Sequence, residues 1–210
     1  MFELGLDQAD GLKQLFIPQL RGRVNVIGVS TDSEPGRLAV GIGKALMNRG
    51  YDVRWDDPAG LLPGNLPCCD GDDLPQIVVS ATLRPELSKD DGQAKCSIFA
   101  ARPHPSELRL LYTSMKAADS LELNGPFTVL WCGKGTEDPQ MRRLCETNLS
   151  ETVAKFLRNP VEFIDTPRGA QDPSRPLTPG VTEAHFLERL SSMLLNRLGY
   201  VSQPVSNLKN

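Results

Sequence analysis

A loop rich in small and hydroxyl-bearing residues follows the first strong strand signal, and its composition suggests phosphate chemistry. Residues 24–30, VNVIGVS, have the pattern of a buried strand, and residues 37–49 have the apolar spacing of a helix. The segment between them, STDSEPG, therefore joins a strand to a helix, which is the connection at which α/β proteins hold phosphate groups. Such a cradle needs backbone N–H groups from glycines, a Lys on the terminal phosphate and a Ser or Thr on Mg²⁺.

The other residues of this loop oppose phosphate binding. It has no Lys and a single glycine, and Pro35 removes a backbone donor. An acid about 4 Å from a phosphate charge costs roughly 4 kcal/mol at an effective dielectric near 20, whereas a helix N-terminus returns only about 0.3–1 kcal/mol. We therefore expect Asp32, Ser33 and Glu34 to cap a helix that holds no ligand. The expected degenerate nucleotide loop consists of Asp32, Ser33, Glu34, Pro35 and Gly36.

Other chemistry-bearing side chains are isolated in the sequence. His104 and His185 fall on different expected helices, so neither a His-based triad nor a zinc site is indicated. His104, between two prolines, is expected at a helix start. Arg37 lies in the first helical turn, where we expect it to pair with Glu34 or to face solvent. We expect no catalytic residue, no metal ion and no cofactor.

Apolar runs and helical periodicity alternate along the chain. Strands are expected at 24–30, 52–57, 76–82, 96–101, 127–132 and 161–164. Helices are expected at 37–49, from a start marked by Pro103 and Pro105 to about 118, at roughly 139–158 and at about 182–198. Strands that alternate with helices imply βαβ units, so the predicted fold is a three-layer α/β domain with a mostly parallel sheet flanked by helices.

Composition narrows the class of protein. The 210 residues suffice for one α/β domain, and the net charge of -3 argues against a nucleic-acid partner. No apolar run is long enough to span a membrane, and the N-terminus lacks the pattern of a secretory signal, so stable membrane insertion is not expected. Five cysteines, an odd number, suit a reducing compartment. We expect a cytoplasmic protein.

The segment RLAVGIGKALMNRGYDV (37–53), followed by Trp55-Asp56-Asp57, resembles the helix and second strand after the deviant Walker A loop of MinD/ParA-type ATPases, members of the SIMIBI class of P-loop NTPases. The resemblance implies a lost Walker A, because both lysines and the Thr of the family's KGGVGKT loop are absent. It places Ser80 where the family has an Asp that orders Mg²⁺, and Cys132 where an Asn reads adenine. These departures imply a pseudo-ATPase.

Within that superfamily, LDQADGLKQLF (6–16) is similar to the DQAxxL pattern at the N-terminus of the FlhG family (also FleN or YlxH), the MinD-like regulators of flagellar number and placement. In that family the segment activates FlhF, an SRP-type GTPase, and the resemblance implies the same partner here, with recruitment to the cell pole or membrane through it. The implied organisation is an activator segment at 1–20, a MinD-like domain at 21–200 and a flexible tail at 201–210. The implied partner-binding residues are Asp7, Gln8, Ala9, Leu12, Leu15 and Phe16.

Several alternatives remain open at this level. The short N-terminal helix cannot be stable alone in water, so it either docks on its own domain or folds on a partner. Instead of a GTPase activator, the chain could be a scaffold of another envelope machine, such as cellulose secretion, or a flavodoxin-like or nucleotide-binding enzyme. The last helix could lie on a membrane, but Glu183 and Glu188 oppose anionic lipid, which favours core packing.

Overall fold

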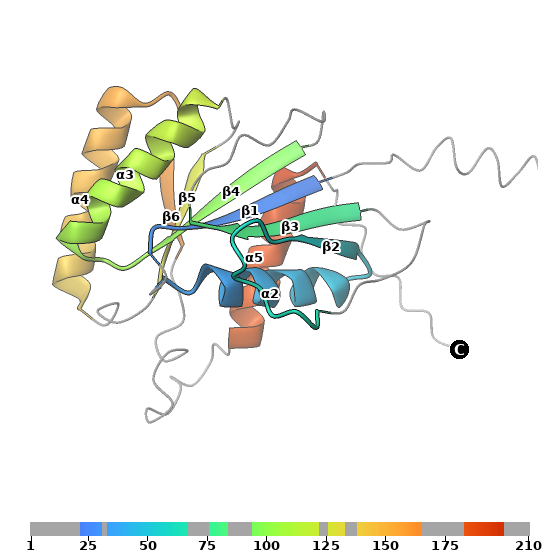
Figure 1. The fold of residues 1–210 in the computed structure, drawn as a ribbon. Coiled ribbons are helices and arrows are strands. Elements are labelled where there is room, and N and C mark those ends of the chain that lie inside the picture. The colour runs from blue at the N-terminus through green and yellow to red at the C-terminus, as the bar shows by residue number, and fades with distance from the viewer. Residues whose placement is uncertain are drawn as a thin grey trace, which may run out of the picture.

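The computed structural model describes residues 22–30, 33–66, 76–83, 94–121, 126–132, 138–164 and 183–199. Within these ranges strands and helices alternate as the sequence predicts (Figure 1). The expected activator segment at 1–20 and tail at 201–210 lie outside the described residues. The elements are β1 (Gly22–Gly28), α2 (Pro35–Met47), β2 (Asp52–Asp56), β3 (Gln76–Thr82), β4 (Ala94–Ala101), α3 (Pro105–Ser120), β5 (Phe127–Trp131), α4 (Pro139–Phe156), β6 (Val161–Ile164) and α5 (Glu183–Arg197).

The six strands form one sheet in the order β2-β3-β1-β4-β5-β6. Every pair of neighbouring strands is parallel, so the sheet is fully rather than mostly parallel. Helices α2 and α5 cover one face, and α3 and α4 cover the other (Figure 1). The predicted three-layer α/β architecture is therefore confirmed.

Alternation along β1 explains how two cores form. Val24 and Val26 point to the face covered by α2 and α5, while Ile27 joins Phe99 on the opposite face. Apolar side chains on both faces of a strand are typical of parallel sheets, whose two faces are both covered. On α5 the residues at helical spacing are buried against the first core, which confirms the expected core packing of this helix; they are Phe186, Leu190 and Leu194.

The two central strands, β1 and β4, are followed by connections that lead to opposite edges of the sheet. From β1 the chain passes through α2 toward β2, and from β4 it passes through α3 toward β5, on the other side of the sheet. Adjacent strands whose connections diverge in this way form a topological switch point, and ligands of open α/β sheets bind at the carboxyl ends of such strands. The expected degenerate nucleotide loop, residues 32–36, follows β1 and therefore lies at this switch point.

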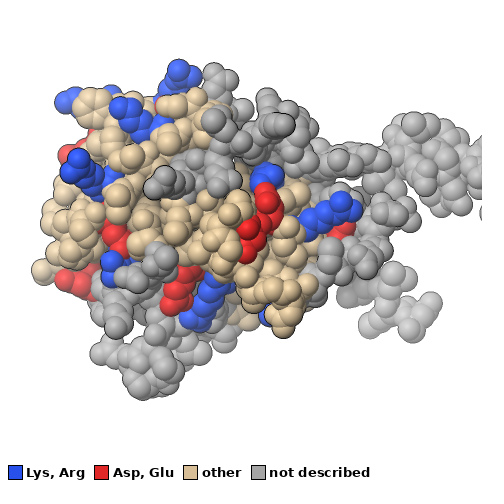
Figure 2. All heavy atoms as spheres, in the orientation of Figure 1, with Lys and Arg blue, Asp and Glu red and all other residues tan. Residues whose placement is uncertain are grey.

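Basic and acidic side chains both lie on the face seen in Figure 2. Several Lys and Arg side chains lie toward the upper left, separated from one another by uncharged residues, and they form no continuous patch among the coloured residues. Nucleic-acid binding requires basic side chains to gather on one face. The described residues on this face therefore form no such surface.

Candidate functional site: the crevice at the ends of β1 and β4

Three segments of the chain, which follow β1, β4 and β5, meet at the switch point. Val29 N donates to the carbonyl of Ala100 at 3.1 Å, which extends the β1–β4 pairing by one residue, and Cys132 N donates to the carbonyl of Ala101 at 2.8 Å. The loop after β1, the loop after β4 and the end of β5 are thus held side by side. We call the place where they meet the switch-point crevice.

The loop after β1 is folded tightly onto the strand that precedes it. A Cβ atom at Gly28 would lie 2.6 Å from Cγ of Pro35 and 2.9 Å from Oγ of Ser33. Ser33 is buried, and its hydroxyl donates to the carbonyl of Ser30 at 2.6 Å. Only a glycine fits at the end of β1, because the side chains of the loop already fill the volume in front of it.

The predicted capping of α2 is wrong in its detail. The N-cap residue, Glu34, makes no side-chain capping hydrogen bond and adopts a left-handed conformation with φ 47° and ψ 47°. The Ser33 hydroxyl is directed back to the loop rather than to the helix, because the loop closes through Ser30. Asp32 lies outside the described residues. The predicted pairing of Arg37 with Glu34 is confirmed, at 3.3 Å, although both side chains are largely exposed.

A second segment covers the start of α2. The carbonyl oxygen of Leu61 lies only 2.1 Å from the position that a Cβ at Gly36 would take. This segment is held by Asp57, whose carboxylate accepts from the backbone N–H of Leu61 at 2.7 Å and of Leu62 at 2.8 Å. The Asp at the end of β2 that the ATPase resemblance highlighted therefore has a structural use, as does Asp56, which forms an ion pair with Arg23.

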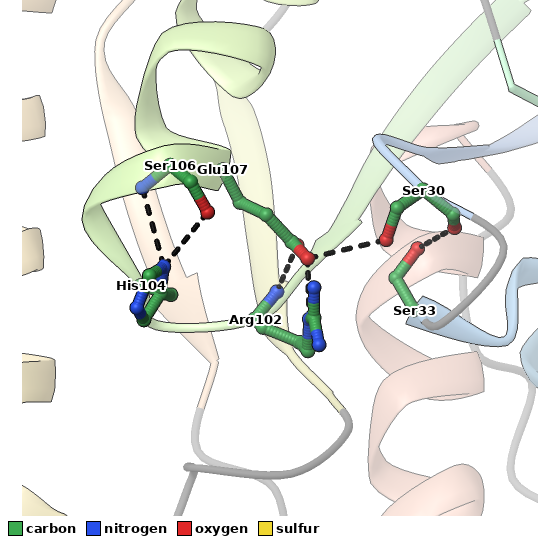
Figure 3. A network of polar contacts seen from close by, with 6 residues as sticks. All are labelled: Ser30, Ser33, Arg102, His104, Ser106 and Glu107. Atoms are coloured by element: carbon green, nitrogen blue, oxygen red, sulfur yellow. Dashed lines mark hydrogen bonds and ion pairs between the residues drawn. The ribbon is translucent and has the colours of Figure 1, made fainter.

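A buried carboxylate lies across the crevice from this loop. Glu107, near the start of α3, is only 3% exposed. Its carboxylate accepts from the backbone N–H of Arg102 at 2.7 Å and from the Ser30 hydroxyl at 3.2 Å, and it forms an ion pair with the Arg102 guanidinium (Figure 3). His104 is the N-cap of α3 and its ring accepts from Ser106 N, which confirms its expected place at a helix start.

Glu107 and Arg102 were not among the predicted site residues. The available signal was local: a Glu three residues after an N-cap is the second half of a capping box. In the usual box this Glu bonds the N-cap residue itself, whereas here it reaches Arg102 and, across the crevice, Ser30. That second contact joins residues 77 positions apart, so no local pattern could have indicated it.

Two carboxylates act on the Cys132 thiol at the end of β5. Burial first, and then the carboxylates of Glu34 and Glu107, raise the pKa of the Cys132 thiol to about 12. Carboxylates that disfavour a thiolate also disfavour a phosphate placed at the same point. The hydrogen bonds of Ser30, Ser33 and Glu107 hold the loop after β1 to the start of α3.

The Cys132 thiol is expected to resist alkylation while the chain is folded. A pKa of about 12 in place of 9.0 lowers the thiolate fraction at pH 8 about a thousandfold. Between pH 9 and about 12 this thiol is ionised in the unfolded chain but still protonated in the folded chain. Its contribution to the free energy of unfolding is therefore fully present below pH 9 and declines as the pH rises toward 12. Peptide mapping after iodoacetamide treatment at pH 8 measures the alkylation of Cys132 in the folded chain and, with urea added, in the unfolded chain. Equal labelling in both states would contradict it.

The remaining predicted site residues have no described geometry. Asp7, Gln8, Ala9, Leu12, Leu15 and Phe16 lie outside the described residues. Among the parts of the chain that are described, no three His, Cys, Asp or Glu side chains gather as metal ligands. None of the helices in those parts is both long and apolar enough to cross a membrane.

Known proteins add no family assignment to this geometry. The chain matches no protein-family model, and no curated protein matches it in sequence.

Proposed function

We propose that this chain is a non-catalytic, MinD-like regulator of the FlhG type. It binds the SRP-type flagellar GTPase FlhF through residues 7–16 and stimulates GTP hydrolysis, and so affects flagellar number or placement. In this proposal it works in the cytoplasm and reaches the cell pole or membrane through its partner. The observation that carries the proposal is the closure of the β1 loop onto Gly28 by Ser33 and Pro35, since a domain with this loop has lost the phosphate cradle that its likeness to MinD implies.

Two further positions support the loss of ATP chemistry. Ser80 stands where MinD-like ATPases have their Mg²⁺-ordering Asp, and its hydroxyl donates to Oδ1 of Asn25 at 2.8 Å. Cys132 stands at the adenine-reading position, where it is buried and its hydrogen bond goes to the carbonyl of Leu130 at 3.4 Å. Both side chains thus donate hydrogen bonds to residues of the sheet. Phosphate, metal and base contacts are thus replaced together, which is what a pseudo-ATPase requires.

The activity then depends on the segment ahead of the domain. Leu12, Leu15 and Phe16 are the apolar anchors of a helix that docks in a groove of the GTPase. Gln8 would lie near the bound GTP, where a Gln can orient water or neighbouring catalytic groups. Gly11 weakens the free helix by about 1 kcal/mol relative to Ala, which suits a segment that orders on binding.

The test is the GTP hydrolysis rate of an FlhF-type GTPase alone and with the full chain, each with and without added ATP. The proposal expects stimulation that ATP leaves unchanged, because the crevice holds no nucleotide. Stimulation that requires ATP would overturn the pseudo-ATPase, and absence of both stimulation and binding would favour the scaffold of another envelope machine.

A further inference from the structure

The buried carboxylate of Glu107 occupies the position at which an open α/β sheet receives an anion. It lies at the switch point, at the start of α3, where helix N-termini favour negative charge. Its donors are a backbone N–H, a guanidinium and a hydroxyl, supplied by Arg102 and Ser30 (Figure 3). This is the donor set that proteins use for carboxylate and phosphate ligands.

The same carboxylate connects the two halves of the crevice. Glu107 accepts from the Ser30 hydroxyl, the carbonyl of Ser30 accepts from Ser33, and Ser33 packs against the end of β1 at Gly28 (Figure 3). The start of α3 is thereby joined to the loop that leads into α2. A buried carboxylate is costly to leave unpaired, so these donors and Glu107 hold each other in place.

We propose that the Glu107 carboxylate is a built-in anion: it fills an anion site formed by Arg102 and Ser30 and keeps the β1 loop closed without any external ligand. The donors of this site accept a carboxylate, and the site becomes available to a small carboxylate from solution when the side chain is removed. This inference concerns the crevice alone, and it holds whichever partner residues 7–16 bind.

Chemical rescue of Glu107→Ala tests the proposal. We expect the variant to melt several degrees below the wild-type chain in chloride, because the donors of Arg102 and Ser30 lose their acceptor. Acetate at about 100 mM should raise its Tm by about 3 °C more than chloride of the same ionic strength, as expected for a ligand that binds only the folded state with a Kd near 10 mM. The wild-type chain should show no such difference between acetate and chloride.

Glu107→Gln is the matched control, because its side chain keeps the volume and removes the charge. It should also melt below the wild type, but acetate should not rescue it, since the amide still fills the site. An equal acetate effect on all three proteins would show a bulk salt effect and overturn the proposal. The Gln variant also keeps the test decisive if the Ala variant does not fold, because a Tm within 1 °C of wild type would contradict the role of the charge.

Discussion

Replacing Gly36 by Ala is expected to lower the free energy of unfolding by roughly 2–3 kcal/mol and the Tm by about 4–8 °C. The added Cβ would lie 2.1 Å from the carbonyl oxygen of Leu61. Because this neighbour is backbone, the segment that follows β2 must move, which strains the two hydrogen bonds from Leu61 and Leu62 to Asp57. Ala returns at most about 1 kcal/mol of helix propensity, which is less than the overpacking costs.

Gly41 on the same helix provides the matched control. A Cβ there would lie 2.9 Å from Cδ1 of Leu187, the far end of a flexible side chain that can rotate away. Gly41→Ala should therefore be neutral or slightly stabilising, through helix propensity. Urea unfolding of both variants measures the difference. If Gly36→Ala proves as stable as Gly41→Ala, the segment carrying Leu61 does not cover the start of α2.

The order and type of the elements could be predicted because their signals are local. Val24, Val26 and Ile27 form a short β-branched and apolar run, and α5 carries its apolar residues at helical spacing. Burial on the sheet follows directly from such patterns. The start of α2 was predicted two residues late, although Pro35 at the first helical position is itself a start signal.

The chemistry of the crevice could be predicted only in part. The absence of a Lys and the presence of Pro35 and Glu34 predict that the loop is not a standard phosphate cradle, and this stays a prediction. Its closure depends instead on contacts between distant residues, such as Ser30 with Glu107. The left-handed conformation of Glu34, beside the contact of Pro35 with the end of β1, was likewise not predicted. Such contacts produce no periodic pattern in the sequence from which they could be predicted.

Loss of the Gln8 side chain is expected to abolish most of the stimulation of the GTPase. Transition-state positioning groups supplied by a partner change phosphoryl-transfer rates by orders of magnitude, so a tenfold or larger loss is expected from Gln8→Ala. Binding should persist, because the apolar residues Leu12, Leu15 and Phe16 provide the contact area. The variant should therefore still bind the GTPase while it fails to accelerate hydrolysis.

Gln14→Ala is the control for this variant, since it removes the same type of side chain from the same segment at a position with no assigned contact. The most direct test of the account is the GTP hydrolysis rate of an FlhF-type GTPase with the wild-type chain, Gln8→Ala and Gln14→Ala, all without ATP. The account predicts full stimulation by the wild type and by Gln14→Ala, and little or none by Gln8→Ala. Equal stimulation by all three chains, or by none, would contradict it.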